Sequence, residues 1–307
     1  MDVARALLLR ASRSHWLAEQ FRRRKFARRA VRRFMPGEGV GVALDASARF
    51  AADGIGSVFT NLGERVTSRE EAAAVREHYA KLLGSIRERR LPAHISVKLT
   101  HLGLDIDAGG CAAAVLSLVE RAADVGSFVW IDMEESQYVD ATLDVFRLAR
   151  ARTERVGVCL QAYLRRTGSD LDALLPLAPA IRLVKGAYRE PPEVAFPRKQ
   201  DTDAAYVALG EQLLDRAGNG ALPVFGTHDM RILERLRRRA DARKLPTGAY
   251  EVHMLYGIKP AQQRALASRR VAVRVLISYG SNWFPWYMRR LAERPANAWF
   301  VVKSLLG

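Results

Sequence analysis

Cysteine is nearly absent from this 307-residue chain, which contains only Cys111 and Cys159. Two cysteines are too few for a disulfide framework or a thiolate metal site, and they are typical of a reducing compartment. No hydrophobic run approaches 18 residues, so we expect no membrane-spanning helix. The apolar run at residues 7–9 is also too short for a secretory signal. We therefore expect a cytoplasmic protein.

Several common motifs are missing as well. The six histidines occur in no HxH or HExxH spacing, so we expect no metal site. No serine lies in a GxSxG turn, which argues against a serine hydrolase. Gly37, Gly39 and Gly41 lack the third glycine, the preceding strand and the acidic partner of a dinucleotide fingerprint, and we interpret them as a flexible loop.

Acidic residues are scarce, with 33 Asp and Glu against 49 Lys and Arg and a net charge of +16. Residues 1–35 contain eleven Lys or Arg against Asp2 and Glu19, a net charge of +9. Apolar residues recur there at roughly helical intervals, which predicts one or two basic amphipathic helices. This arm could contact an anionic membrane surface or nucleic acid, act as an organelle-targeting peptide, or simply pack on the main domain.

From residue 57 onward, short β-branched and apolar runs alternate with longer amphipathic stretches. Eight runs predict strands, at residues 57–62, 94–99, 128–133, 157–163, 180–185, 222–227, 250–255 and 271–277. Thr67 and Ser68, followed by Glu70 and Glu71, mark the start of one intervening helix. Eight βα units in about 250 residues favour a (β/α)₈ TIM-type barrel over a doubly wound sheet. We predict a helical arm at residues 1–56 and one barrel domain at residues 57–307.

Polar residues gather where these strands end, which is where barrel enzymes place their chemistry. They are Lys98, Asp132, Glu134, Gln161, Arg182, Lys185, Thr227 and His228. This collection indicates a binding site for anionic ligands. Lys98 and Asp132 fall at equivalent depths on adjacent strands and could form an ion pair beside a substrate, or a structural pair that closes the barrel top.

The last fifth of the chain carries four aromatics, Trp283, Phe284, Trp286 and Tyr287, followed by two adjacent arginines. On a helix, Glu293 lies three and four residues from Arg290 and Arg289, so one carboxylate could hold a pair of guanidinium groups in place. Such a fork suits a carboxylate ligand. A solvated, salt-bridged helix is the alternative, but the aromatics suggest a helix that packs against something.

Five motifs along the chain carry a family resemblance. They lie at residues 161–166 (QAYLRR), 182–188 (RLVKGAY), 227–228 (TH), 254–257 (MLYG) and 288–295 (MRRLAERP). Together they resemble the bacterial monofunctional proline dehydrogenases. The resemblance implies a distorted (β/α)₈ barrel with a helical N-terminal arm, a bound FAD, oxidation of L-proline to 1-pyrroline-5-carboxylate, and transfer of the electrons to a quinone-type acceptor.

The resemblance also assigns roles to individual residues. Lys98, Leu255, Leu276, Arg289, Arg290 and Glu293 match substrate-binding positions, with the two arginines as the carboxylate clamp and Glu293 as its brace. Asp132, as the partner of Lys98, and Arg182, as the arginine near the flavin N5, match catalytic positions. The FAD contacts are matched by Met133, Gln161, Arg182, Val184, Lys185, Gly186, Ala187, Thr227 and His228.

One departure concerns the substrate. Leu276 stands where typical members have a tyrosine that shields the substrate ring, and Ile277-Ser278 stands where Val-Pro is common. The substrate is therefore L-proline, or hydroxyproline or another cyclic imino acid, unless Tyr256 or Tyr279 compensates. The alternative from another functional class is a non-catalytic barrel protein that uses its basic charge to bind nucleic acid or a membrane, or that acts as a scaffold. The strand-end residues, which match a catalytic set, argue against this alternative.

Overall fold

The computed structural model describes residues 31–292, and within them eight parallel strands close into a barrel in chain order. The strands are β1 (Gly56–Asn61), β2 (Ala93–Val97), β3 (Val129–Ile131), β4 (Val156–Gln161), β5 (Ala180–Val184), β6 (Leu222–Gly226), β7 (Glu251–Leu255) and β8 (Ala272–Tyr279). Pairing of β1 with β8 closes the ring. All eight predicted strands are confirmed, each beginning within one residue and ending within two residues of the predicted position.

Helices alternate with the strands, as the hydrophobic pattern predicts. They are α4 (Val40–Ala52), α5 (Arg69–Glu88), α6 (Ala108–Asp124), α7 (Val139–Arg150), α8 (Thr167–Leu174), α9 (Lys199–Arg216), α10 (Met230–Ala242), α11 (Pro260–Ser268) and α12 (Trp283–Ala292). Short 3₁₀ turns occur at η1 (Thr100–Leu102), η2 (Ser136–Tyr138) and η3 (Leu175–Leu177). Ser68 caps α5 by accepting from the Glu71 N–H, and the Glu71 carboxylate accepts from the Thr67 N–H, so the predicted start signal is confirmed.

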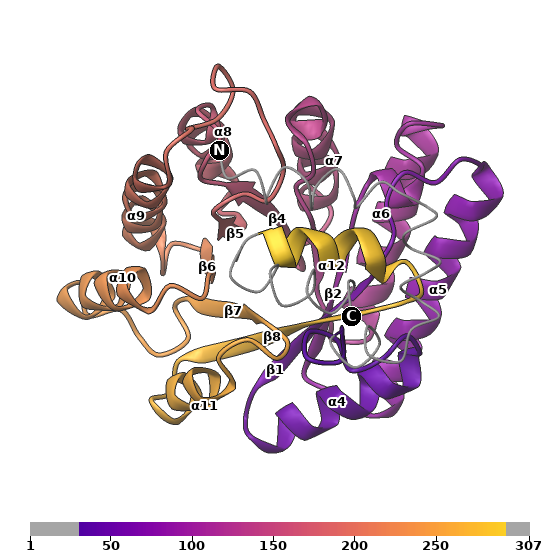
Figure 1. Ribbon diagram of the computed structural model, residues 1–307, viewed down its shortest axis with the longest axis horizontal. Helices are drawn as coiled ribbons and strands as arrows, with labels where there is room; N and C mark the ends of the chain where they lie inside the picture. Colours follow the sequence, from indigo (N-terminus) through magenta and orange to yellow (C-terminus); the bar gives the residue numbers. More distant parts are fainter. Residues whose placement is uncertain (1–30, 293–307) are drawn as a thin grey trace, which may run out of the picture.

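The barrel is distorted at the point where its ring of helices should close. The helix after β8, α12, does not lie beside the barrel but crosses over the strand ends, and α4 lies on the outside instead (Figure 1). α4 contacts both β1 and β8 there. One end of the barrel is therefore covered by a helix that comes directly from the last strand.

Aromatic packing seats α12, as the sequence suggests. Trp283, Phe284, Trp286 and Tyr287 are all buried. The Trp283 indole donates to the Glu38 carboxylate over 2.9 Å. The segment before α4 thus packs on α12, and the described end of the N-terminal arm is part of the folded body.

Residues 1–30 lie outside the described part of the chain, so the basic helices expected there and the domain division after residue 56 remain predictions. The flexible-loop prediction is wrong for Gly41, which lies in the first turn of α4 just after the N-cap Gly39. Backbone hydrogen bonding of the helix, and burial of Ala43 and Leu44 against the barrel, outweigh the low helix propensity of glycine here. Among residues 31–292, no helix is long and apolar enough to cross a membrane.

Inside the barrel, a small apolar layer separates two groups of polar side chains. Val58, Trp130, Ala180 and Val224 form this layer. Toward the amino ends of the strands lie His94, Glu251, His253 and Arg274, which we call the lower cluster. Toward the carboxyl ends lie Ser96, Lys98, Asp132 and Arg182, which we call the upper network.

Candidate active site

A cavity of about 910 Å³ opens at the carboxyl ends of the strands, beneath Trp286 of α12. This volume is near the upper end of the range for small-molecule sites. The predicted site residues that line it are Lys98, Asp132, Met133, Gln161, Arg182, Val184, Lys185, Gly186, Ala187, Thr227, His228, Leu255 and Leu276. The structure therefore brings together every predicted site residue whose side chain it describes.

The remaining predicted site residues fall on the last helix. The backbone of Arg289 and Arg290 belongs to α12, but their side chains lie outside the described part of the structure, as does the whole of Glu293. The carboxylate clamp therefore stays a prediction.

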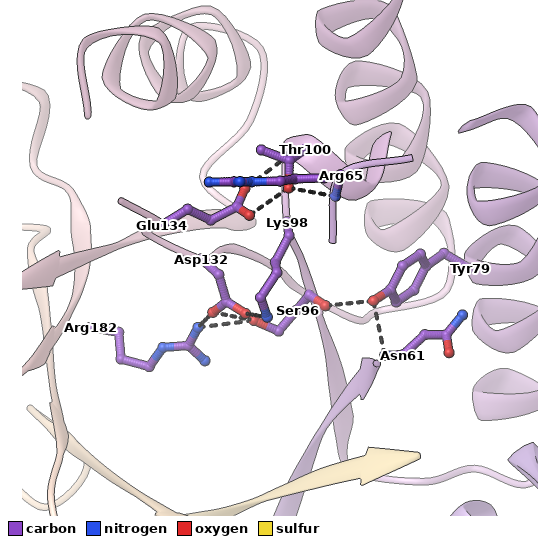
Figure 2. A network of polar contacts seen from close by, with 9 residues as sticks. All are labelled: Asn61, Arg65, Tyr79, Ser96, Lys98, Thr100, Asp132, Glu134 and Arg182. Atoms are coloured by element: carbon purple, nitrogen blue, oxygen red, sulfur yellow. Dashed lines mark hydrogen bonds and ion pairs between the residues drawn. The ribbon is translucent and has the colours of Figure 1, made fainter. Parts of the chain in front are cut away.

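Asp132 is the centre of the upper network (Figure 2). One carboxylate oxygen lies 3.5 Å from the ammonium nitrogen of Lys98, which confirms the predicted ion pair. The other accepts a hydrogen bond from the Ser96 hydroxyl over 2.9 Å and pairs with the guanidinium of Arg182. The Ser96 hydroxyl in turn accepts from Arg182 over 2.9 Å. One carboxylate thus fixes two cations at the floor of the cavity.

Arg182 is the most buried cation of the site, with only 4% of its surface exposed. Its guanidinium carbon lies 5.1 Å from the centre of the Trp130 ring, a cation–π distance. Its Nη2 is used by Asp132 and Ser96, while its buried Nη1 makes no hydrogen bond within residues 31–292. A buried N–H without a partner is costly, so this donor fits an acceptor on a ligand bound in the cavity.

Strand periodicity explains why these side chains meet. Successive residues of a strand face opposite sides, so Ala180 of the interior layer places Arg182 inside the barrel, two residues further along β5. Trp130 and Asp132 are related in the same way on β3. Ser96, two residues before Lys98, escaped the sequence analysis because we considered only residues at the strand ends. The same period-two rule could have found it.

A second set of hydrogen bonds braces the network from outside (Figure 2). The Tyr79 hydroxyl of α5 donates to the Ser96 carbonyl over 2.8 Å and accepts from the Asn61 N–H over 3.0 Å. The Glu134 carboxylate accepts from the Thr100 N–H and hydroxyl, over 3.0 and 2.6 Å. Burial raises the pKa of Glu134 to about 7. Through its two hydrogen bonds to Thr100, Glu134 anchors η1 next to Lys98.

The side of the cavity near β5 and β6 is rich in cations. The Lys185 ammonium pairs with Asp203 over 2.5 Å and with Asp229 over 3.2 Å. Three further cations that the sequence analysis missed, Lys199, Arg231 and Lys259, line the same cavity. In all, six cations and three carboxylates line it, a balance that favours an anionic ligand such as a dinucleotide pyrophosphate. Lys199 and Arg231 lie on helices α9 and α10, where no strand-end rule could find them.

Gly186 and His228 show how the loops of this cavity are fixed. Gly186 has a φ of +120°, and a Cβ there would lie 2.2 Å from the Tyr163 ring, so only glycine fits. His228 Nε2 accepts the Leu255 N–H over 2.8 Å, which places the ring proton of the neutral imidazole on Nδ1. Within the described residues, no three His, Cys, Asp or Glu side chains are grouped to hold a metal ion.

These features fit a flavin dinucleotide. The cavity is large, and its lining carries excess positive charge. Gly186 has no side chain, so a ligand can approach its backbone closely. The buried guanidinium of Arg182 has a donor that makes no hydrogen bond to the described residues. The cavity also covers eight strand ends, where barrel enzymes bind cofactors and substrates.

Solved structures confirm the fold. Proline utilization A (PutA) from Bdellovibrio bacteriovorus, inactivated by N-propargylglycine, superposes with a TM-score of 0.80 at 23% identity, over 86% of this chain. A PutA mutant from Bradyrhizobium japonicum gives a TM-score of 0.74 at 23% identity, over 89% of this chain. The chain spans only about a third of each of those proteins, 32% in both cases.

Sequence comparisons show the family. The model of the proline dehydrogenase family matches residues 43–303. Proline dehydrogenase 1 of Bacillus subtilis subsp. natto is 36% identical over 280 residues, 91% of each chain. Proline dehydrogenase of Deinococcus radiodurans is 36% identical over 293 residues, 94% of this chain and 93% of that one. This chain therefore belongs to the proline dehydrogenase family, as an FAD-dependent enzyme that oxidises proline to 1-pyrroline-5-carboxylate.

Proposed function

We propose that the upper network is the catalytic centre of proline oxidation, with Asp132 and Arg182 as its catalytic residues and Lys98 as a substrate-binding residue. FAD, when bound, accepts the hydride removed from the carbon next to the substrate nitrogen. Met133, Gln161, Val184, Lys185, Gly186, Ala187, Thr227 and His228 would hold the cofactor, with Arg182 beside its reactive part. All of these residues line one cavity, as the assignment requires.

The observation that carries this proposal is the unpaired donor on Arg182. Its guanidinium is fixed from one side by Asp132 and Ser96 and supported by the Trp130 ring, so it cannot turn away from the cavity. A fixed cation in a dry site stabilises negative charge that develops during a reaction far better than a mobile one in water. Reduction of a flavin creates such a charge, and Arg182 would stabilise it.

Lys98 and the arginines of α12 would act on the substrate. Asp132 keeps the Lys98 ammonium in place, and Lys98 is largely buried, with 14% of its side chain exposed. A buried ammonium beside the cavity attracts the carboxylate of an imino acid. Arg289 and Arg290, braced by Glu293, would complete the carboxylate clamp, and Leu255 and Leu276 would contact the ring. Fixing both ends of the substrate converts hydride transfer into an oriented, intramolecular step.

The test is the visible spectrum of the purified protein during anaerobic addition of L-proline. We expect the bands of oxidised flavin, and their bleaching by proline. Asp132→Asn should slow the bleaching strongly, because it releases Lys98 and Arg182. Asp140→Asn is the matched control, since Asp140 pairs with an arginine, Arg166, but its side chain is 77% exposed and does not line the cavity. A colourless protein that FAD cannot reconstitute would contradict the proposal.

We further propose that the electrons pass to a quinone-type acceptor and that the basic residues 1–35 bring the enzyme to the anionic inner face of a membrane. The support is the net charge of +9 on that segment, since each basic residue near an anionic surface adds to the attraction. This assignment places the enzyme in the cytoplasm, peripheral to the membrane that contains the acceptor.

Vesicle binding of the full chain tests this part. Neutralising Arg22, Arg23, Arg24 and Lys25 to glutamine should weaken cosedimentation with vesicles that contain anionic lipid. The control variant neutralises the same number of exposed arginines spread over the barrel surface, Arg76, Arg87, Arg121 and Arg269. Equal binding of the two variants would contradict a specific role of the arm.

A further inference from the structure

Two hydroxyl side chains lie next to each other in the wall of the cavity, on the strands that close the barrel. Thr60 of β1 and Ser278 of β8 are direct partners in the parallel register. Val58 and Leu276, each two residues earlier on the same strands, belong to the barrel interior, so Thr60 and Ser278 also face inward. Both line the cavity together with Lys98.

Both hydroxyls are buried and can still accept a hydrogen bond. Thr60 is 4% exposed and Ser278 is 1% exposed, and neither side-chain oxygen makes a hydrogen bond to any residue between 31 and 292. Burial raises the pKa of Tyr79, and the nearby Thr60 hydroxyl lowers it. Because the Tyr79 hydroxyl donates to the Ser96 carbonyl, it can at most accept the Thr60 proton, and the Thr60 oxygen stays able to accept a hydrogen bond from a ligand. Buried polar groups are rarely left without a partner, and those that are indicate a missing ligand or water.

The spacing of the pair fits a single oxygen atom. Neighbouring strands lie about 4.8 Å apart, so side chains in register start from Cα atoms at about that separation. Hydroxyl hydrogen bonds are about 2.8 Å long, so one ligand oxygen can bond to both Thr60 and Ser278 at once. One hydroxyl can donate to that oxygen while the other accepts its proton, because serine and threonine do both.

The side chains around Thr60 and Ser278 indicate the chemistry of the rest of the ligand. Leu255, Leu276 and Val58 lie side by side in register, and they form an apolar layer just beneath the two hydroxyls. Leu276 offers no polar group of its own to this space. A ligand that matches this wall has a small hydrocarbon ring with a single hydroxyl, next to a carboxylate that Lys98 attracts.

We propose that Thr60 and Ser278 form a subsite for a ring hydroxyl, and that the enzyme accepts a hydroxylated proline as a substrate. The inference rests on the proposed function, because it takes the substrate ring to lie against Leu255 and Leu276. The ring hydroxyl does not react. The two-electron oxidation at the carbon next to nitrogen is the same as for proline, and the two side chains only change which ring is preferred.

The experiment compares flavin reduction by L-proline with flavin reduction by trans- and cis-4-hydroxy-L-proline, in four full-length holoenzymes. These are the wild type, Thr60→Val, Ser278→Ala and Ser57→Ala. Thr60→Val keeps the shape of the side chain and removes only the hydroxyl. Ser57 is the matched control because it is on the same strand as Thr60 and is fully buried, and its hydroxyl also makes no hydrogen bond to the described residues, but it does not line the cavity.

The readout is the ratio of kcat/KM for a hydroxyproline to kcat/KM for proline. Loss of one neutral hydrogen bond should lower the ratio for at least one hydroxyproline about tenfold in Thr60→Val and in Ser278→Ala. Ser57→Ala should keep the wild-type ratio. The ratio cancels any general loss of folded enzyme or of bound FAD, since such a loss lowers kcat/KM for both substrates by the same factor.

Two other results overturn the inference. The first is a ratio that is the same in all four proteins, which would show that water or nothing fills the space between the hydroxyls. The second is a wild type whose flavin is reduced by proline but by neither hydroxyproline. Failure of the proposed function looks different, because none of the three substrates would then reduce the flavin of the wild type.

Discussion

The two ends of the barrel interior both hold buried charges, but they use them differently. In the lower cluster, the Glu251 carboxylate accepts from Arg274 over 2.8 Å and pairs with His253 over 2.9 Å. Arg274 also donates to the Pro92 carbonyl. One anion meets one cation there. Among the described residues, Nδ1 of His253 is the only buried side-chain nitrogen or oxygen of this cluster without a hydrogen bond. Burial lowers the pKa of this ring to about 4, so the ring is neutral at pH 7.

In the upper network, one carboxylate serves two cations. Asp132 pairs with both Lys98 and Arg182, and one donor of Arg182 makes no hydrogen bond within residues 31–292. Positive charge is therefore left over in the upper network, beside the cavity, and balanced in the lower cluster, where only His253 reaches the cavity lining. Burial of charge alone therefore does not mark a functional site. An unmatched charge beside a cavity does, in keeping with the division of barrels into a catalytic and a stabilising face.

The strongest way to test this division is to remove the anion of the lower cluster. Glu251→Leu leaves Arg274 buried without its partner, so we expect the free energy of unfolding to fall by about 3–5 kcal/mol. Urea denaturation monitored by circular dichroism measures the loss. The folded fraction should still reduce its flavin with proline at the wild-type rate. Glu251→Gln is the milder control, since its amide oxygen still accepts a hydrogen bond. A slow but fully stable Glu251→Leu enzyme would contradict the division.

The converse change is made at the upper end. Arg182→Met removes the cation that would stabilise the reduced flavin, and we expect flavin reduction to slow by about 10²–10³-fold. Stopped-flow absorbance after mixing with proline gives the rate. Arg274→Met removes an arginine from the lower cluster and should lower stability without that loss of rate. Equal rates in the two variants would break the comparison between the two ends.

The sequence predicted the barrel well because its signal is local. Eight β-branched runs at regular spacing determine eight strands, and the residues at their ends must meet once the barrel closes. Lys98 and Asp132 could be paired on that basis alone. The family motifs then added Gly186, and they gave His228, already found at a strand end, a role that no spacing rule suggests.

The features that escaped depend on three-dimensional contacts. Asp203 is on α9, and only packing of that helix on β5 and β6 brings it to Lys185. The register of Thr60 with Ser278 joins the first strand to the last and follows from closure of the ring, not from any local pattern. Gly41 was misjudged because tertiary burial of α4 outweighs the local propensity of glycine.

Acidification should destabilise the folded protein through the buried His253 of the lower cluster. The pKa of His253 is about 4 in the folded protein and has an ordinary value of 6.5. Between these values the unfolded chain binds a proton that the folded protein does not, so stability falls as the pH drops from 6.5 to 4, by about 3 kcal/mol for this group. Unfolding curves across this range measure the slope, and His253→Gln should flatten it. If His253→Gln leaves the slope unchanged, another group causes the acid sensitivity. His101 is an example, because burial also lowers its pKa to about 4.

The smallest test removes one hydroxyl from each end of the barrel. Ser96→Ala takes away a donor to Asp132 and an acceptor for Arg182, whereas Ser127→Ala takes away a donor to the Ala93 carbonyl at the amino end of β2. Ser127→Ala breaks one buried hydrogen bond and should lower the free energy of unfolding by about 1 kcal/mol, whereas Ser96→Ala breaks two and should lower it by about 2 kcal/mol. Only Ser96→Ala should also slow flavin reduction, by about tenfold, since it loosens the guanidinium that the direct pair with Asp132 still holds. A loss of rate in the folded Ser96→Ala enzyme that Ser127→Ala does not share would locate the chemistry at the upper end without deleting any charge. Equal rates would mean that Asp132 alone positions Arg182.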